Sequence, residues 1–145
     1  MLPGVVRPIN FPPNYTPLPP GYVEFNLASH LLMLGRVEHV SPQTIRSLNQ
    51  FLQEMEPVMM WNSCNGCLIG AESELSLDAT PTSHSFYHKL AAKYQARRRL
   101  RFTTVKRYFE DKYKITLSYP NSPLLRDPSG SMFPIECVWV RFRVR

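Results

Sequence analysis

The sequence predicts a small α+β domain, in which a twisted β-sheet and two short helices follow a disordered, proline-rich N-terminal arm. Three observations lead to this prediction. The chain has 145 residues, 43% of them hydrophobic, which suits one domain with a modest core. Short segments alternate between apolar and polar residues, as strands do, whereas two others carry apolar residues at helical spacing. Seven of the 14 prolines lie in the first twenty residues.

The arm is expected over residues 1–20, because neither a helix nor a central strand tolerates so many prolines. Within it, Pro12-Pro13-Asn14-Tyr15 has the form of a PPxY peptide. The polyproline conformation of such a peptide fits the aromatic groove of WW domains. Two interpretations follow: a WW-domain ligand that uses Pro12, Pro13 and Tyr15, or a plain proline-rich tail.

The next segment predicts two strands and a helix. Alternating residues indicate strands over 22–25 and 35–40. Ser41-Pro42 then combines a helix N-cap with proline at the first helical position, and Pro57 ends the helix. Apolar residues recur between them at spacings of three and four, namely Ile45, Leu48, Leu52 and Met55. This stripe is explained by core packing.

The rest of the chain predicts a second helix among short strands. Thr103 or Thr104 offers an N-cap for a helix that runs to about Lys114. Strands are expected over residues 75–77, 115–119 and 138–145, and turns over residues 62–70 and 127–130.

Charge is distributed very unevenly along the chain. Residues 1–88 contain three basic and seven acidic residues, a net charge of −4, whereas residues 89–145 contain fourteen basic and four acidic residues, a net charge of +10. A basic block favours a polyanionic partner, because neutralising phosphates releases counterions. The alternative is a solubilising surface. Five basic residues cluster in this block: Lys93, Arg97, Arg98, Arg99 and Arg101.

Several classes of protein are disfavoured. No apolar run has the length of a membrane span, and we expect no signal peptide. Three cysteines, an odd number, fit a reducing compartment, so we expect a cytosolic or nuclear protein. We expect no enzyme and no cofactor, because the sequence has neither a glycine-rich phosphate loop nor a GxSxG elbow. Glu72, Glu74 and Asp78 are best interpreted as a solvated acidic face.

One motif is similar to a zinc site. Cys64 and Cys67 form a CxxC pair, and His84 and His88 follow it. The gap between the two pairs is slightly longer than in zinc fingers, and Pro81 restricts His84 to the first turn of any helix. A zinc-stabilised nucleic-acid module is therefore an alternative, and loop cysteines with surface histidines are the simpler interpretation.

The predicted helix from Thr104 to Lys114 suggests a phosphate site. At about 100° per residue, Tyr108, Lys112 and Tyr113 lie within one arc with the apolar Val105 and Phe109. Two phenol hydroxyls and an ammonium at one place can bind a single phosphate. The alternative is an amphipathic helix with tyrosines at the rim of the core.

Residues 104–113 have the pattern TV..YF..KY on a predicted helix, residues 115–119 alternate as a strand, and residues 119–125 have the pattern YP..P.L. This order of motifs is similar to the second half of the PAZ domain of Argonaute proteins, and the resemblance covers residues 104–137. Met132-Phe133-Pro134-Ile135-Glu136-Cys137 resembles the strand that follows. Looser likenesses place residues 75–80 in the linker before PAZ and residues 25–52 in the N-terminal domain of these proteins.

The resemblance implies an RNA-binding protein of small-RNA silencing that holds the 3′ end of a single-stranded guide. In the family, the positions matching Tyr108, Lys112 and Tyr113 hold the terminal phosphate linkage. It also implies an incomplete PAZ or OB-like barrel, a cytoplasmic location and silencing-complex proteins as partners. We expect Arg97, Arg98, Arg99 and Arg101 to follow the RNA backbone.

The chain departs from the family between the linker and the helix. The long first half of PAZ, which supplies the opposite wall of the pocket, is reduced here to residues 89–102. We therefore divide the chain into the arm at 1–20, an N-domain and linker-like segment at 21–88 and a partial PAZ-like unit at 89–145, without slicing activity. The chain is either a degenerate or alternatively spliced Argonaute-like product or a divergent minimal RNA-binding protein.

Overall fold

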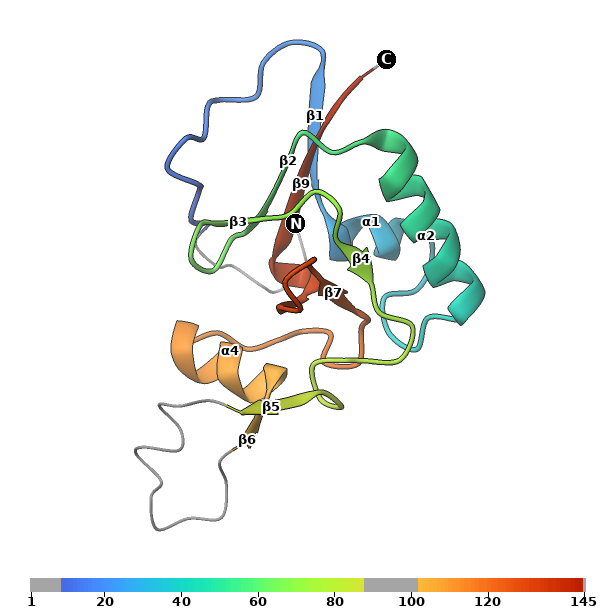
Figure 1. The fold of residues 1–145 in the computed structure, drawn as a ribbon, viewed down its shortest axis with the longest axis vertical. Helices are drawn as coiled ribbons and strands as arrows, with labels where there is room; N and C mark the ends of the chain where they lie inside the picture. The colour runs from blue at the N-terminus through green and yellow to red at the C-terminus, as the bar shows by residue number, and fades with distance from the viewer. Residues whose placement is uncertain (1–8, 88–101, 145) are drawn as a thin grey trace.

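The computed structural model describes residues 9–87 and 102–144 (Figure 1). These residues form an α+β domain, as the sequence predicts, with antiparallel strands in three open sheets. Within the described residues the strands do not close into a barrel. Three α-helices are present in this part of the chain instead of the two expected.

The largest sheet has four strands in the order β1-β9-β2-β3. Their bounds are Tyr22–Asn26 for β1, Met59–Asn62 for β2, Cys67–Ile69 for β3 and Val138–Arg143 for β9. The C-terminal strand β9 thus lies between two strands from the first half of the chain, and Val140 pairs with both Phe25 and Met60. Strand β9 confirms the strand predicted for residues 138–145 as far as Arg143, since Val138, Val140 and Phe142 are all fully buried. Val144, predicted on the same face, is 53% exposed.

Two helices cover one face of this sheet (Figure 1). Helix α2, Pro42–Met55, begins at Ser41, whose hydroxyl accepts a hydrogen bond from the Thr44 N–H, so the predicted N-cap is confirmed. Helix α1, Leu27–Met33, was missed by the sequence analysis. The residue that marks the start of this helix in the sequence is the N-cap Asn26. Its side chain accepts hydrogen bonds from the N–H groups of Ala28 and Ser29.

The predicted strand over residues 35–40 is wrong. Gly35 and His39 both have positive φ values, +111° and +55°, which interrupt an extended backbone. Val37 from this segment is buried in the core, and the half-buried Val40 packs against it. The alternation in the sequence therefore marks a loop that turns two apolar side chains toward the core.

The remaining strands form two small sheets below the first (Figure 1). Strands β4 (Glu74–Leu75), β7 (Leu124–Arg126) and β8 (Met132–Pro134) make one of them, and β5 (Ser85–Tyr87) pairs with β6 (Phe102–Thr104) in the other. A 3-10 turn, η1, covers Ile135–Cys137, and helix α4 covers Val105–Tyr113. Strands from the predicted 21–88 and 89–145 segments share both larger sheets.

The predicted strand over residues 115–119 is also wrong, because side chains take the hydrogen bonds that a neighbouring strand would make. The Leu117 N–H donates to Glu110 Oε2 at 2.9 Å. The N–H groups of Ser118 and Tyr119 donate to the two oxygens of Glu136 at 2.9 and 2.8 Å. The buried Glu136 carboxylate therefore holds this segment as an ordered loop.

The predicted turn over residues 62–70 contains the β2–β3 hairpin, whereas the turn at Asp127–Gly130 is present as expected. Gly66 closes the hairpin with φ +76°, and a Cβ at this position would lie 2.6 Å from the Phe11 carbonyl oxygen. Only glycine fits there. The close approach also shows that the N-terminal arm rests on this hairpin.

The prediction of a disordered arm is wrong for residues 9–20, which lie against the face of the sheet opposite the helices (Figure 1). The Asn10 N–H donates to the Ser63 carbonyl at 2.9 Å, and Pro12 is buried. Arg141 Nη2 donates to the Thr16 carbonyl at 2.6 Å. Buried partners on the sheet thus order a segment whose composition alone indicates an unstructured tail.

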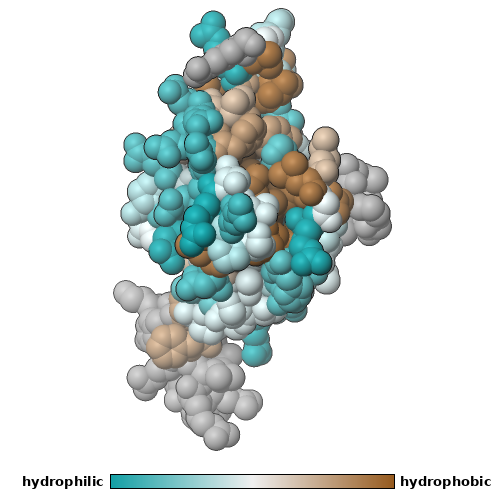
Figure 2. Space-filling view, turned by 90° about the vertical axis from the view of Figure 1, so that its right-hand side faces the viewer, coloured by the Kyte–Doolittle hydropathy of each residue, from teal (hydrophilic) through white to brown (hydrophobic). Residues whose placement is uncertain are grey.

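The described surface carries exposed apolar residues at the end of α1. Leu32, Met33 and Leu34 are 42%, 85% and 59% exposed. Figure 2 views the side of the molecule that carries the helices and shows hydrophobic surface among hydrophilic residues. Of the helices in the described ranges, none combines the length and the apolar character needed to cross a bilayer.

Candidate nucleic-acid interface

Helix α4 presents the residues expected to bind phosphate. It begins at Thr104, whose hydroxyl accepts a hydrogen bond from the Arg107 N–H at 3.1 Å, as the sequence predicts. Val105 and Phe109 are buried in a second apolar cluster with residues such as Leu124. The anchored face fixes the direction in which the other side of the helix points.

Tyr108 and Lys112 meet on this helix, one turn apart. Lys112 Nζ donates to the Tyr108 hydroxyl at 2.7 Å and lies 5.2 Å from the centre of its ring. The same ammonium lies 5.5 Å from the ring centre of Tyr113, whose hydroxyl accepts a hydrogen bond from Asn65 Nδ2 at 3.1 Å. The structure thus gathers the three predicted side chains, with Asn65 beside them, around one positive charge.

These side chains line a pocket of about 330 Å³. The volume is at the lower end of the range typical of small-molecule sites. Its polar lining residues are Asn62, Asn65, His84, Tyr108, Lys112, Tyr113 and Ser131, and its other lining residues are Phe86, Val105, Phe109, Gly130, Met132 and Phe133. The lining contains a lysine and a histidine but no carboxylate, so the pocket favours an anion.

The electrostatics of the pocket keep Lys112 charged. The hydrogen bond to Tyr108 raises the pKa of the Lys112 ammonium above its usual value, and this outweighs the lowering by burial. Burial raises the pKa of Tyr113. At neutral pH the pocket therefore presents an ammonium and a neutral Tyr113 phenol, a combination that supplies both charge and hydrogen-bond donors.

Several pocket residues were missed by the sequence analysis. Phe86, Met132 and Phe133 come from strands β5 and β8, and Asn65 comes from the β2–β3 hairpin. No local pattern marks them as neighbours of α4. His84 was expected only as a possible zinc ligand, and Asn65 is a spacer residue between Cys64 and Cys67.

The predicted arginine run, Arg97, Arg98, Arg99 and Arg101, lies outside the described residues. The run lies in the segment of sequence that joins β5 to β6, two strands that the structure does describe. These strands pair up to Tyr87 and Phe102, and Phe86 on β5 lines the pocket. The basic segment therefore follows a strand that lines the pocket, β5, and precedes the strand paired with it, β6.

The possible zinc ligands do not form a metal site in the described residues. His88 lies outside them, and no group of three or more His, Cys, Asp or Glu side chains in the described ranges is arranged to hold a metal ion. Cys64 Sγ contacts Cys137 Sγ instead, at 3.3 Å, and Cys67 is exposed on β3. Metal analysis of the purified protein tests the zinc alternative directly.

The PPxY peptide is engaged within the molecule. Its tyrosine, Tyr15, donates to Glu24 Oε1 at 3.1 Å, and the guanidinium of Arg141 lies 4.9 Å from the centre of the Tyr15 ring. Pro12 is buried. A WW domain needs access to the proline and tyrosine side chains of such a peptide, so it would have to displace residues 12–15 from the sheet.

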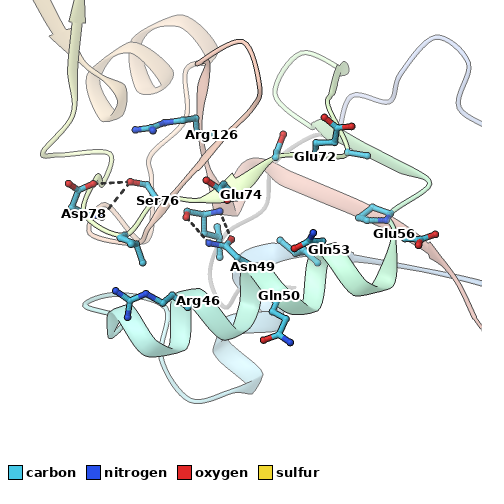
Figure 3. A pocket seen from close by; sticks show the side chains of 16 residues that line it. Arg46, Asn49, Gln50, Gln53, Glu56, Glu72, Glu74, Ser76, Asp78 and Arg126 are labelled. Carbon is cyan, nitrogen blue, oxygen red and sulfur yellow. Dashed lines mark hydrogen bonds between the residues drawn. The ribbon is translucent and has the colours of Figure 1, made fainter.

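A larger hollow, of about 910 Å³, lies between α2 and residues 71–78 (Figure 3). Asn49 bridges it at one point, accepting from the Leu75 N–H and donating to the Leu75 carbonyl. Its lining includes four carboxylates and two guanidiniums, those of Glu56, Glu72, Glu74, Asp78, Arg46 and Arg126. This excess of negative charge opposes a phosphate ligand, which distinguishes the hollow from the smaller pocket at α4.

Comparisons with known proteins leave the chain without an assigned family. No protein-family model matches the sequence, and no curated protein matches it either. The residues of this chain and the geometry of the α4 pocket are therefore the basis for a function.

Proposed function

We propose that the chain binds the 3′ end of a single-stranded RNA in the α4 pocket. The observation that supports this proposal best is the cluster of Tyr108, Lys112 and Tyr113 in a pocket without carboxylates. A phosphate oxygen placed there would accept hydrogen bonds from the Lys112 ammonium and from a phenol. Hydrogen bonds to charged groups contribute about 1.5–3 kcal/mol each, which is enough to fix the position of a chain end.

The apolar wall of the pocket suits a terminal nucleotide. Phe86, Met132 and Phe133 face the same cavity as the polar cluster. Proteins commonly recognise single-stranded RNA by stacking unpaired bases on aromatic side chains while cations hold the backbone. A base against this wall and a phosphate at Lys112 would use both halves of the pocket.

The basic segment between β5 and β6 would extend this interface along the RNA. Arg97, Arg98, Arg99 and Arg101 would then contact successive phosphates without reading the bases. The proposal also includes the finer expectations of the resemblance: an incomplete PAZ-like barrel, a cytoplasmic location, silencing-complex proteins as partners and no slicing activity. The placement of Tyr108, Lys112 and Tyr113 around one cavity supports the proposed binding of an RNA end.

Fluorescence anisotropy with labelled RNA of guide length tests the proposal. We expect a free 3′ hydroxyl end to bind more tightly than a blocked 3′ end. Lys112→Met keeps the apolar stem but removes the charge, so it should weaken binding by about 10- to 100-fold. Arg107→Met is the matched control, because Arg107 lies on the same helix, is exposed and does not line the pocket.

The result that would overturn the proposal is also specific. If Lys112→Met and Arg107→Met weaken binding equally, and blocking the 3′ end has no effect, then the basic surface alone attracts RNA. In that case affinity should fall steeply with salt for every RNA end.

A further inference from the structure

Two cysteines that lie far apart in the sequence meet next to the pocket. Cys64, in the β2–β3 hairpin, and Cys137, at the end of η1, place their Sγ atoms 3.3 Å apart. The backbone here is already paired, because the Ser63 N–H and hydroxyl both donate to the Cys137 carbonyl. The two sulfurs therefore lie close to bonding distance across a fixed piece of structure.

We propose that Cys64 and Cys137 form a reversible disulfide when the protein meets a peroxide. The Cys64 thiolate attacks one peroxide oxygen, the O–O bond breaks, and a sulfenic acid forms with release of water. The Cys137 sulfur then attacks the Cys64 sulfur and displaces a second water, which leaves the S–S bond. Two thiols are oxidised, and one hydrogen peroxide is reduced to two waters.

The burial of the two thiols sets their order of reaction. Cys137 is fully buried, whereas Cys64 is partly exposed, so an oxidant in solvent reaches Cys64 first. A sulfenic acid persists only until a thiol reaches it, and the Cys137 sulfur is already in contact. Cys67, three residues from Cys64, is the competing thiol and is exposed on β3.

Disulfide formation would alter the pocket, a step that rests on the proposed function. The distance between the two Sγ atoms must shorten from 3.3 Å to about 2.05 Å. Cys137 is held in the core, so most of the movement falls on the hairpin residue Cys64. Its neighbour Asn65 donates to the Tyr113 hydroxyl and shares the pocket lining with it. Oxidation should therefore weaken RNA binding by about two- to tenfold, the effect of losing one neutral hydrogen bond.

The test uses the full chain in the folded state. Protein treated with hydrogen peroxide is unfolded, alkylated, digested and analysed by mass spectrometry. We expect a pair of peptides cross-linked through Cys64 and Cys137. Dithiothreitol should reduce this cross-link. The cross-link should persist in Cys67→Ser and disappear in Cys64→Ser, a substitution at a partly exposed position that leaves the buried Cys137 in place.

Three results would overturn the disulfide: a Cys64–Cys67 cross-link as the main product, an alkylated Cys137 beside a sulfinic acid at Cys64, or a Cys67–Cys137 cross-link that forms in Cys64→Ser with the same yield. The RNA measurement is separate. A cross-link that forms while RNA affinity stays the same refutes the effect on the pocket. Absence of RNA binding in reduced protein refutes the proposed function and leaves the cross-link as an independent result.

Discussion

Replacing Arg141 with alanine should strongly destabilise the fold. Arg141 lies on the central strand β9 and forms an ion pair with Glu24 of β1 at 2.9 Å. The two side chains are only 6% and 13% exposed. The guanidinium also donates to the Thr16 carbonyl and lies over the Tyr15 ring, so this one side chain joins the arm to the sheet.

The magnitude follows from burial. Removing one partner of a buried ion pair leaves an uncompensated charge and costs about 3–5 kcal/mol. Arg141→Ala should therefore lower the free energy of unfolding by about that amount, a large part of the 5–15 kcal/mol typical of a domain. The double variant Glu24→Ala, Arg141→Ala should cost less than the sum of the two single changes, since it leaves no charge unpaired.

Urea unfolding followed by tryptophan fluorescence measures these changes. The signal reports on the arm, because the rings of Phe11 and Tyr15 lie 6.2 and 5.6 Å from that of Trp61. Arg107→Ala is the control, since it breaks an exposed pair with Asp111 that is worth at most about 1 kcal/mol. A cost for Arg141→Ala no larger than that of this control would refute the reasoning.

Three further changes have expected outcomes. Burial lowers the pKa of His30 from its usual value of 6.5, so the unfolded chain binds a proton at a higher pH than the folded chain does. The free energy of unfolding should therefore fall as the pH drops below 6.5. His30→Gln should make urea midpoints measured above and below this pH more alike. Thr104→Ala should cost about 1 kcal/mol in chemical unfolding, whereas Thr104→Ser should retain the cap of α4; equal losses would contradict that role. Glu136→Gln should cost about 1.5–3 kcal/mol, because its carboxylate accepts the N–H groups of Ser118 and Tyr119; an unchanged unfolding free energy would contradict this.

Helices were predicted best where the cap and the apolar stripe agree. Ser41 and Thr104 both cap helices in the structure, and the Ile45, Leu48 and Leu52 stripe is buried. Strands were predicted less well, because alternation over a few residues does not show whether a partner strand exists. Residues 115–119 alternate but bond to side chains of Glu110 and Glu136 instead.

The candidate site, too, was predictable in one part and not in another. The spacing of Tyr108, Lys112 and Tyr113 on one helix was sufficient to expect that they lie together. The opposite wall was not predictable, because Asn65 and Phe133 reach the pocket from elements far away in sequence. Their positions depend on how the hairpin and β8 pack against α4.

The local conformations of α2, α4 and β9 were predictable from the sequence alone, and so was the concentration of basic charge in the second half of the chain. Caps, helical spacing and charge act within a few residues and can be read directly. Three features are visible only in the folded chain: residues 9–20 pack on the sheet, Cys64 contacts Cys137, and β9 lies between β1 and β2. These contacts depend on hydrogen-bond register and burial across distant segments, which no local pattern specifies.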